Sequence, residues 1–349
     1  MSASDRIPLA QLPTPLERAD RLSEAWGVDV WIKRDDLTGF GLSGNKVRKL
    51  EYHLKAALDA GATTVITCGA AQSNHSRATA LAAAKLGLRT VLYLRTPDGQ
   101  PPEQVWGNHL LQRLAGAECR FITPDEYDDR DAVMAAAASE IGNSSETGDA
   151  WVIPEGASDA LGSRGFEFAA GELGLQVADF DTPITIWHAS MSAGTTAGLV
   201  RGVEIHGLDA TIVGCAVGDS ADGIAGRVRD ILGDESTTVT WSINDDHIGG
   251  GYGIISNDEL AIQAEATRLT GLLFDPTYTG KAIVGLHREI ERGTFGPEDT
   301  VVFWHTGGGF ATFAHDWSCL LYTSPSPRDP RGDRVCRLLL ENGGGGGGG

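Results

Sequence analysis

Apolar runs alternate with amphipathic stretches along most of this chain. Seven runs rich in valine and isoleucine read VDVWIKRDD, TTVITCGA, RTVLYLR, AWVIPEG, ITIWHAS, TIVGCAV and VVFWHTGG. Continuous apolar runs of this length are typical of strands buried in a parallel sheet. Alanine-rich stretches such as SRATALAAAKLG and DAVMAAAASEIG lie between them and predict helices. This alternation predicts an α/β fold in which helices cover both faces of a parallel sheet, with ligands at the carboxyl ends of the strands.

The end of the chain departs from this pattern. Residues 318–349 show no periodicity, contain several prolines and finish in a run of glycine. Proline interrupts both helices and strands, and glycine has no side chain to pack. We therefore interpret 318–349 as a non-native or disordered tail, such as translated vector sequence, with a genuine flexible tail as the alternative.

Composition excludes several classes of function. The chain has 349 residues, 41% of them hydrophobic, and a formal net charge of −19, which would repel nucleic acid and anionic membranes. No apolar run is long enough to span a membrane, and the first residues lack a signal-peptide core, so we expect a cytoplasmic protein. The five cysteines show neither CxxC spacing nor a Cys/His cluster, which argues against a metal site or a disulfide framework.

Lys46 stands where a cation is not expected. The stretch LSGNKVRKLEYH, residues 42–53, places it on the first turn of a predicted helix, whose free N–H groups disfavour positive charge. A helix start and a dry pocket both lower the pKa of a lysine, and a neutral amine is a nucleophile toward aldehydes. The alternative is a surface lysine that covers apolar neighbours.

Two strand-to-helix turns carry clusters of small or polar residues. Residues 72–75 read QSNH at the start of one helix, where side chains and free N–H groups can hold a carboxylate; helix capping by Ser73 or Asn74 explains only part of the cluster. Residues 190–196 read SMSAGTT before another helix, and such small residues let backbone N–H groups approach a phosphate. This turn matches neither common nucleotide-binding motif, so an ordinary turn is the alternative.

Aromatic and hydroxyl residues mark the last third of the chain. Tyr252 lies in GGGYGI, Tyr278 in FDPTYTGKA, and Thr306 follows a buried strand in VVFWHTGGG. Tyrosines beside glycines suit a flat aromatic ligand, although each one by itself is as easily explained by a turn or by core packing.

Taken together, these segments resemble the D-cysteine desulfhydrase / 1-aminocyclopropane-1-carboxylate deaminase family. The similarity runs in order through LPTPLERADRL, WIKRDDLTG, SGNKVRKLEY, QSNHSRATALAAAKLG, IPEGASDALGSRGF, SAGTTAGL, GYGI, DPTYTGKA and HTGGGFATF. The resemblance implies an enzyme that uses pyridoxal 5′-phosphate and has the tryptophan-synthase-β-like fold type II, with two open twisted parallel-type sheets. It further implies a large domain from residues 1–49 and 166–317, a smaller αβα domain at 50–165, and a homodimer.

The resemblance also implies roles for individual residues. Lys46 matches the lysine that binds the cofactor covalently, with Asn45 before it, and Asn74 matches the asparagine that hydrogen-bonds the ring oxygen. Ser73 matches the serine beside the substrate carboxylate. The phosphate-binding turn is matched by Ser192, Ala193, Gly194 and Thr195.

The same resemblance bears on the reaction. Tyr252 and Tyr278 match tyrosines of the active site, and Thr279 stands where the deaminases have a glutamate that contacts the ring nitrogen. Together with Thr306 in HTGG, this favours β-elimination from D-cysteine, giving pyruvate, sulfide and ammonia. Deamination of the cyclopropane amino acid, L-cysteate sulfo-lyase activity, a serine or threonine dehydratase and a non-catalytic binder stay open. Met191 replaces a glycine common before the phosphate turn, which leaves specificity open.

Overall fold

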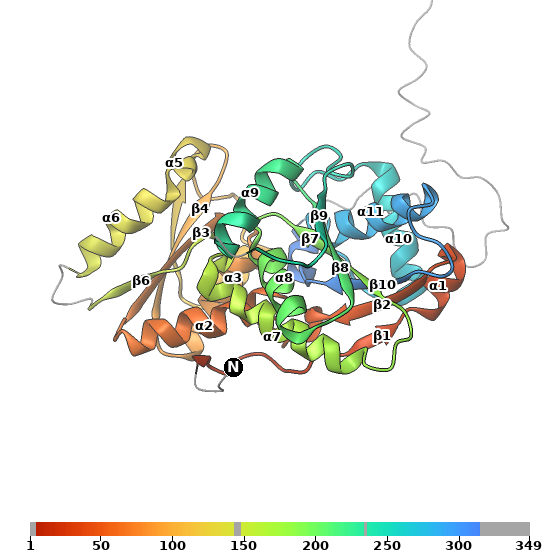
Figure 1. Ribbon diagram of the computed structural model, residues 1–349. Helices are drawn as coiled ribbons and strands as arrows, with labels where there is room; N and C mark the ends of the chain where they lie inside the picture. Colours follow the sequence, from red (N-terminus) through yellow and green to blue (C-terminus); the bar gives the residue numbers. More distant parts are fainter. Residues whose placement is uncertain (1–4, 143–147, 234–235, 315–349) are drawn as a thin grey trace, which may run out of the picture. The chain divides into compact units, whose positions relative to one another are not determined.

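The computed structural model describes residues 5–142, 148–233 and 236–314, and those up to Phe313 belong to one compact unit. The predicted tail, 318–349, lies outside the described residues. Two sheets organise the compact unit, with helices packed on both faces of each (Figure 1). The predicted α/β class is therefore confirmed.

The larger sheet has six strands in the order β1-β2-β10-β7-β8-β9. They are β1 (Leu16–Arg18), β2 (Asp29–Arg34), β7 (Ile184–Ser190), β8 (Ala210–Ala216), β9 (Trp241–Asn244) and β10 (Thr300–His305). All neighbouring pairs are parallel except β1 with β2. Every residue of β10 is buried, as expected for a central strand.

The smaller sheet has four parallel strands in the order β5-β4-β3-β6. They are β3 (Thr64–Ala70), β4 (Arg89–Arg95), β5 (Glu118–Ile122) and β6 (Ala150–Val152). All seven predicted strands are present, but the prediction missed β1, β5 and β9, which lie at sheet edges. The strand β6 also ends earlier than predicted, at Val152, two residues before Pro154.

Helices fill the intervals between the strands. They are α1 (Asp20–Trp26), α2 (Lys46–Asp59), α3 (Asn74–Lys85), α4 (Gly107–Leu114), α5 (Pro124–Asp128), α6 (Arg130–Gly142), α7 (Ala160–Gln176), α8 (Gly194–His206), α9 (Ala221–Leu232), α10 (Asn257–Thr270), α11 (Thr279–Glu291) and α12 (Gly309–Thr312). On the larger sheet, α7, α8 and α9 pack on one face and α1, α10 and α11 on the other. The smaller sheet has α2 and α3 on one face and α6 on the other.

The strands of the smaller sheet fall within the predicted range 50–165, and those of the larger sheet fall outside it. Whether these ranges form separate domains stays a prediction. The folding unit does bring together the carboxyl ends of β3, β7 and β10, each followed by a polar or small-residue segment.

Candidate active site

Lys46 is the first residue of α2, as predicted, and Asn45 is its N-cap. The preceding loop is held by backbone hydrogen bonds from Gly44 N–H to Asp35 O (3.0 Å) and from Asn45 N–H to Thr306 O (3.0 Å). Burial lowers the pKa of the Lys46 amine to about 8, although Glu155 acts in the opposite direction. An amine with this pKa is partly unprotonated near neutral pH, so it can act as a nucleophile or a base.

The start of α3 supplies one wall of the site. Ser73 caps the helix by accepting a hydrogen bond from Ser76 N–H (3.1 Å), and it also lines the cavity beside Lys46. Asn74 accepts a hydrogen bond from the Asn108 amide (2.8 Å), which orients its side chain. The His75 ring hydrogen-bonds Thr67 instead (2.7 Å). The sequence left helix capping and a binding role as alternatives for this cluster. In the structure Ser73 both caps α3 and lines the cavity.

The turn before α8 supplies the opposite wall. Ala193 is its N-cap and has a positive φ of 68°, a conformation that L residues rarely adopt. The Asn45 amide donates to Thr195 Oγ1 (3.1 Å), which ties this turn to the start of α2. The N–H groups at the start of α8 have no partners within the helix and favour an anion.

A buried lysine lies against this turn. Lys49 is fully buried and donates to Ser158 Oγ (3.0 Å), whose hydroxyl contacts Ser192 Oγ (2.8 Å). A Cβ on Gly194 would come within 2.9 Å of Lys49 Nζ. Burial and the neighbouring Lys46 lower the pKa of Lys49 well below its usual value. A buried amine beside a helix start is a site for a dianion such as phosphate, so the residues present fit a phosphorylated cofactor.

Two tyrosines line the cavity next to each other. The hydroxyls of Tyr252 and Tyr278 lie 2.7 Å apart, and their rings meet edge to face. Burial raises the pKa of Tyr252 to about 12 and that of Tyr278 well above its usual value, so both hydroxyls stay protonated. Thr306 lines the cavity after β10, whereas the Thr279 hydroxyl bonds Asp275 Oδ1 (2.8 Å) away from it.

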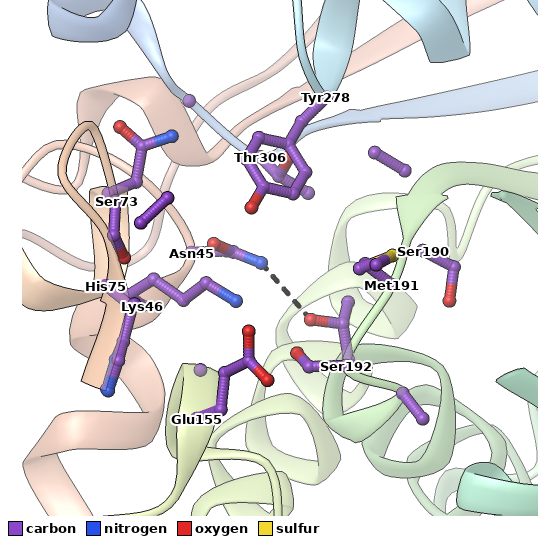
Figure 2. A pocket seen from close by; sticks show the side chains of 18 of the residues that line it. Asn45, Lys46, Ser73, His75, Glu155, Ser190, Met191, Ser192, Tyr278 and Thr306 are labelled. Carbon is purple, nitrogen blue, oxygen red and sulfur yellow. Dashed lines mark hydrogen bonds between the residues drawn. The ribbon is translucent and has the colours of Figure 1, made fainter. Parts of the chain in front are cut away.

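These elements surround one cavity (Figure 2). Every residue that the sequence analysis assigned to the site lines it except Gly194, which lies behind the turn against Ser158 and Lys49. No role was predicted from the sequence for Glu155, Gly156 or Lys49. Gly156 faces Lys46 Nζ so closely that a Cβ would lie 3.2 Å from it. The sequence did point to Glu155 and Gly156, because both lie in IPEGASDALG, one of the segments that resemble the family.

Other kinds of site are not seen in the part of the chain that the structure describes. There, no group of three or more His, Cys, Asp or Glu side chains is placed to hold a metal ion. No helix among the described residues is long and apolar enough to cross a membrane.

Comparisons with known proteins agree with this geometry. A family model described as pyridoxal-phosphate dependent enzyme matches residues 7–307. A D-cysteine desulfhydrase of Salmonella choleraesuis is 39% identical over 318 residues, which is 89% of this chain and 96% of that protein.

Solved structures give the same result at the level of the fold. A crystal structure of a homologue of 1-aminocyclopropane-1-carboxylate (ACC) deaminase is 35% identical, with a TM-score of 0.75, over 89% of this chain and 94% of that one. An L-serine ammonia-lyase of the fungus Rhizomucor miehei is 18% identical, with a TM-score of 0.61, over 86% of this chain and 94% of that one. The second likeness concerns the fold alone.

Proposed function

Because the chain belongs to the family of pyridoxal-phosphate dependent enzymes, with the fold type II of that family, we propose that it is a D-cysteine desulfhydrase. The reaction consumes D-cysteine and one water and yields pyruvate, sulfide and ammonia. The observation that carries this proposal is the cavity in which Lys46, the turn before α8 and a tyrosine pair face one another. The Salmonella relative that bears the same name supports the choice of substrate.

Four groups of this chain would hold the cofactor. Lys46 Nζ would bind its aldehyde carbon, and the turn from Ser192 to Thr195 would hold its phosphate with Lys49 behind it. Asn74, oriented by Asn108, would hydrogen-bond the ring oxygen. Thr306, which lines the cavity, would offer a neutral hydroxyl to the ring nitrogen. When bound, pyridoxal phosphate delocalises the electron pair left at the substrate Cα.

The remaining side chains act on the substrate. Ser73 and the free N–H groups of α3 bind the substrate carboxylate. The Lys46 amine removes the proton from Cα, and its pKa of about 8 suits a base at neutral pH. The Tyr252 and Tyr278 hydroxyls, which burial keeps protonated, are available to donate a hydrogen bond to the leaving sulfur. The 2-aminoacrylate that leaves the site hydrolyses to pyruvate and ammonia.

ACC deaminase activity is the second candidate, because a homologue of that enzyme has the same fold. The buried Asp275 lies against the loop after Thr306, since a Cβ on Gly308 would lie 2.5 Å from its Oδ1. Its carboxylate accepts hydrogen bonds from Thr279 Oγ1 and from the N–H groups of Thr277, Tyr278 and Thr279. Neither Asp275 nor Thr279 lines the cavity. A ring nitrogen that meets a hydroxyl is a weaker electron sink than one that meets a carboxylate, which favours elimination of a good leaving group. Parallel assays for sulfide, 2-oxobutanoate and sulfite separate the candidates.

The homodimer and the cytoplasmic location belong to the same proposal. The homodimer rests on the resemblance to the family, and the cytoplasmic location rests on the expectation from the sequence given above. Sedimentation equilibrium of the purified protein tests the first, and fractionation of cells tests the second.

Replacing Lys46 by alanine tests the central assignment. Lys46→Ala should remove the visible absorbance of the bound cofactor and lower sulfide release from D-cysteine by at least about a thousandfold, since base and covalent anchor are lost together. Absorbance spectra and a sulfide assay on the purified protein measure both.

Lys55→Ala is the matched control on the same helix. Lys55 pairs with Asp59 on the surface of α2, where its loss should change neither colour nor rate. A yellow Lys46→Ala protein that retains activity would refute the assignment of this lysine.

A further inference from the structure

Glu155 lies at the boundary between the cavity and a second hollow beside it, which we call the outer hollow. Residues that line both spaces form what we call the opening: Ala70, Glu155, Met191, Ser192, Tyr252 and Tyr278. Glu155 carries the only charge among them. In Figure 2 its carboxylate points into the cavity, with Lys46 on one side and Ser192 on the other. A charged group at an opening attracts oppositely charged molecules that pass it and repels those of like charge.

The backbone fixes Glu155 in this place. It begins a short 3-10 helix (Glu155–Ala157) after Pro154, and Gly156 has a positive φ of 67°. A Cβ on Gly156 would lie 2.6 Å from Ser192 Oγ and 3.2 Å from Lys46 Nζ, so this segment lies directly against both walls of the cavity. The backbone that carries Glu155 therefore has little room to shift.

Arg130 holds the carboxylate from the outside. Its Nε lies 3.2 Å from Glu155 Oε2, and Arg130 lines the outer hollow but not the cavity. Arg227, another cation of the outer hollow, is paired with Asp219 (2.7 Å). Arg95, the third, lies over the Tyr127 ring at 5.0 Å. Asp128, Asp131 and Asp219 line the outer hollow as well, so its three arginines give it no net positive charge.

The substrate side chain must point to this opening. An amino acid whose Cα is at the Lys46 amine and whose carboxylate is at the start of α3 has its β-substituent on the side away from α3. Tyr252 and Tyr278, which would donate a hydrogen bond to the leaving group, belong to the opening. The β-substituent therefore lies beside Glu155.

We propose that Glu155 is a specificity-determining residue that admits amino acids with an uncharged β-substituent, such as a thiol, and rejects those with an anionic one, such as a sulfonate or a carboxylate. This inference rests on the proposed function for the position of Cα. An anion at the opening would be repelled by Glu155, and Arg130 already has its carboxylate partner. The inference deepens the choice of a desulfhydrase over a sulfo-lyase.

Asparagine and aspartate test the proposal, since they have nearly the same shape and differ in the charge of the β-substituent. Titration calorimetry on the holoenzyme, with both enantiomers of each, gives the ratio of the two dissociation constants. We expect the wild type to bind asparagine about tenfold more tightly than aspartate, the effect of one nearby, partly screened charge. Glu155→Gln should reduce this preference to within about threefold. The Glu155 side chain is 41% exposed, so this substitution should not impair folding, and an unchanged melting temperature verifies that.

Asp128→Asn is the matched control. It removes the same charge from the outer hollow, but Asp128 is exposed and does not belong to the opening, so the preference should stay as in the wild type. Any of three results would overturn the proposal. The preference for asparagine could be the same in the wild type and in Glu155→Gln, both variants could lose it equally, or neither amino acid could bind. Failure of the proposed function is seen separately, as a coloured protein that binds asparagine but releases no sulfide from cysteine.

Discussion

Gly44 and Gly307 let two loops meet directly above the candidate site. Gly44 precedes Asn45 and Lys46, and Gly307 follows Thr306 after β10. Both have positive φ, 107° and 90°, and a Cβ on Gly307 would lie 2.5 Å from Gly44 Cα. Contact at this distance leaves no room for a side chain. The position of Lys46 thus depends on two residues that carry no chemistry of their own.

We expect Gly307→Ala to lower the free energy of unfolding by about 3 kcal/mol, the sum of a left-handed alanine and an overpacked contact. Urea denaturation measures the change. Gly293→Ala is the control, because Gly293 has a similar φ of 79° but no atom within 4 Å of the added Cβ. It should cost only about 1 kcal/mol. Equal losses in the two variants would show that the close approach is unimportant.

At the scale of elements, a buried ionic cluster fastens α2 to its neighbours. Arg48 on α2 pairs with Asp35 after β2 (2.8 Å) and with Glu172 on α7 (3.0 Å), and Lys33 on β2 pairs with Glu172 as well. All four side chains are nearly inaccessible to water. Burial alone would raise the pKa of Glu172, but Arg48 and Lys33 lower it to about 2. The helix that carries Lys46 is therefore positioned by charges that lie outside the cavity.

Glu172→Gln should destabilise the protein by about 3 kcal/mol at pH 7, because it leaves buried cations without their partner. The folded-state pKa of Glu172 is depressed, so its contribution is present above the unfolded value of about 4.3 and is lost as pH falls toward about 2. The difference between variant and wild type should accordingly shrink below about pH 4. Denaturation curves at several pH values measure it.

Glu17→Gln is the corresponding control. Glu17 pairs with Arg34, but its side chain is 49% exposed, so the loss should stay below about 1 kcal/mol. A similar loss in both variants, or a difference that does not depend on pH in the acid range, would contradict a stabilising role for the buried cluster.

At the scale of the whole molecule, charge is the dominant feature. The formal net charge is −19, with 47 acidic residues against 28 basic ones. Excess charge of one sign destabilises a compact state through self-repulsion, and salt screens it. The outer hollow follows this trend, because its three arginines are outnumbered by Asp128, Asp131, Asp219 and Glu155.

We expect the melting temperature to rise when potassium chloride is raised from about 0.05 M to about 1 M, because screening weakens the repulsion between acidic side chains. Differential scanning calorimetry measures it. The same titration with sucrose, which carries no charge, separates screening from general exclusion of solutes. A melting temperature that falls with salt would mean that the ion pairs outweigh the repulsion.

Much of the architecture could be predicted from the sequence because it depends on local pattern. Buried strands such as β3, β7 and β10 are continuous apolar runs, and the turns that follow them contain small or polar residues. The edge strands β1, β5 and β9 were missed, since they are short and partly exposed and are defined by their partners rather than by their own residues.

What the sequence by itself determined is the order of strands and helices, the helix-start position of Lys46, and the small-residue turn before α8, because each follows from neighbours along the chain. Only the tertiary structure decided which distant side chains share the cavity. It placed Glu155 at the opening and Lys49 against the turn before α8, and it turned Thr279 toward Asp275. The physical reason is that the direction of a side chain depends on the packing and hydrogen bonds of elements far apart in sequence.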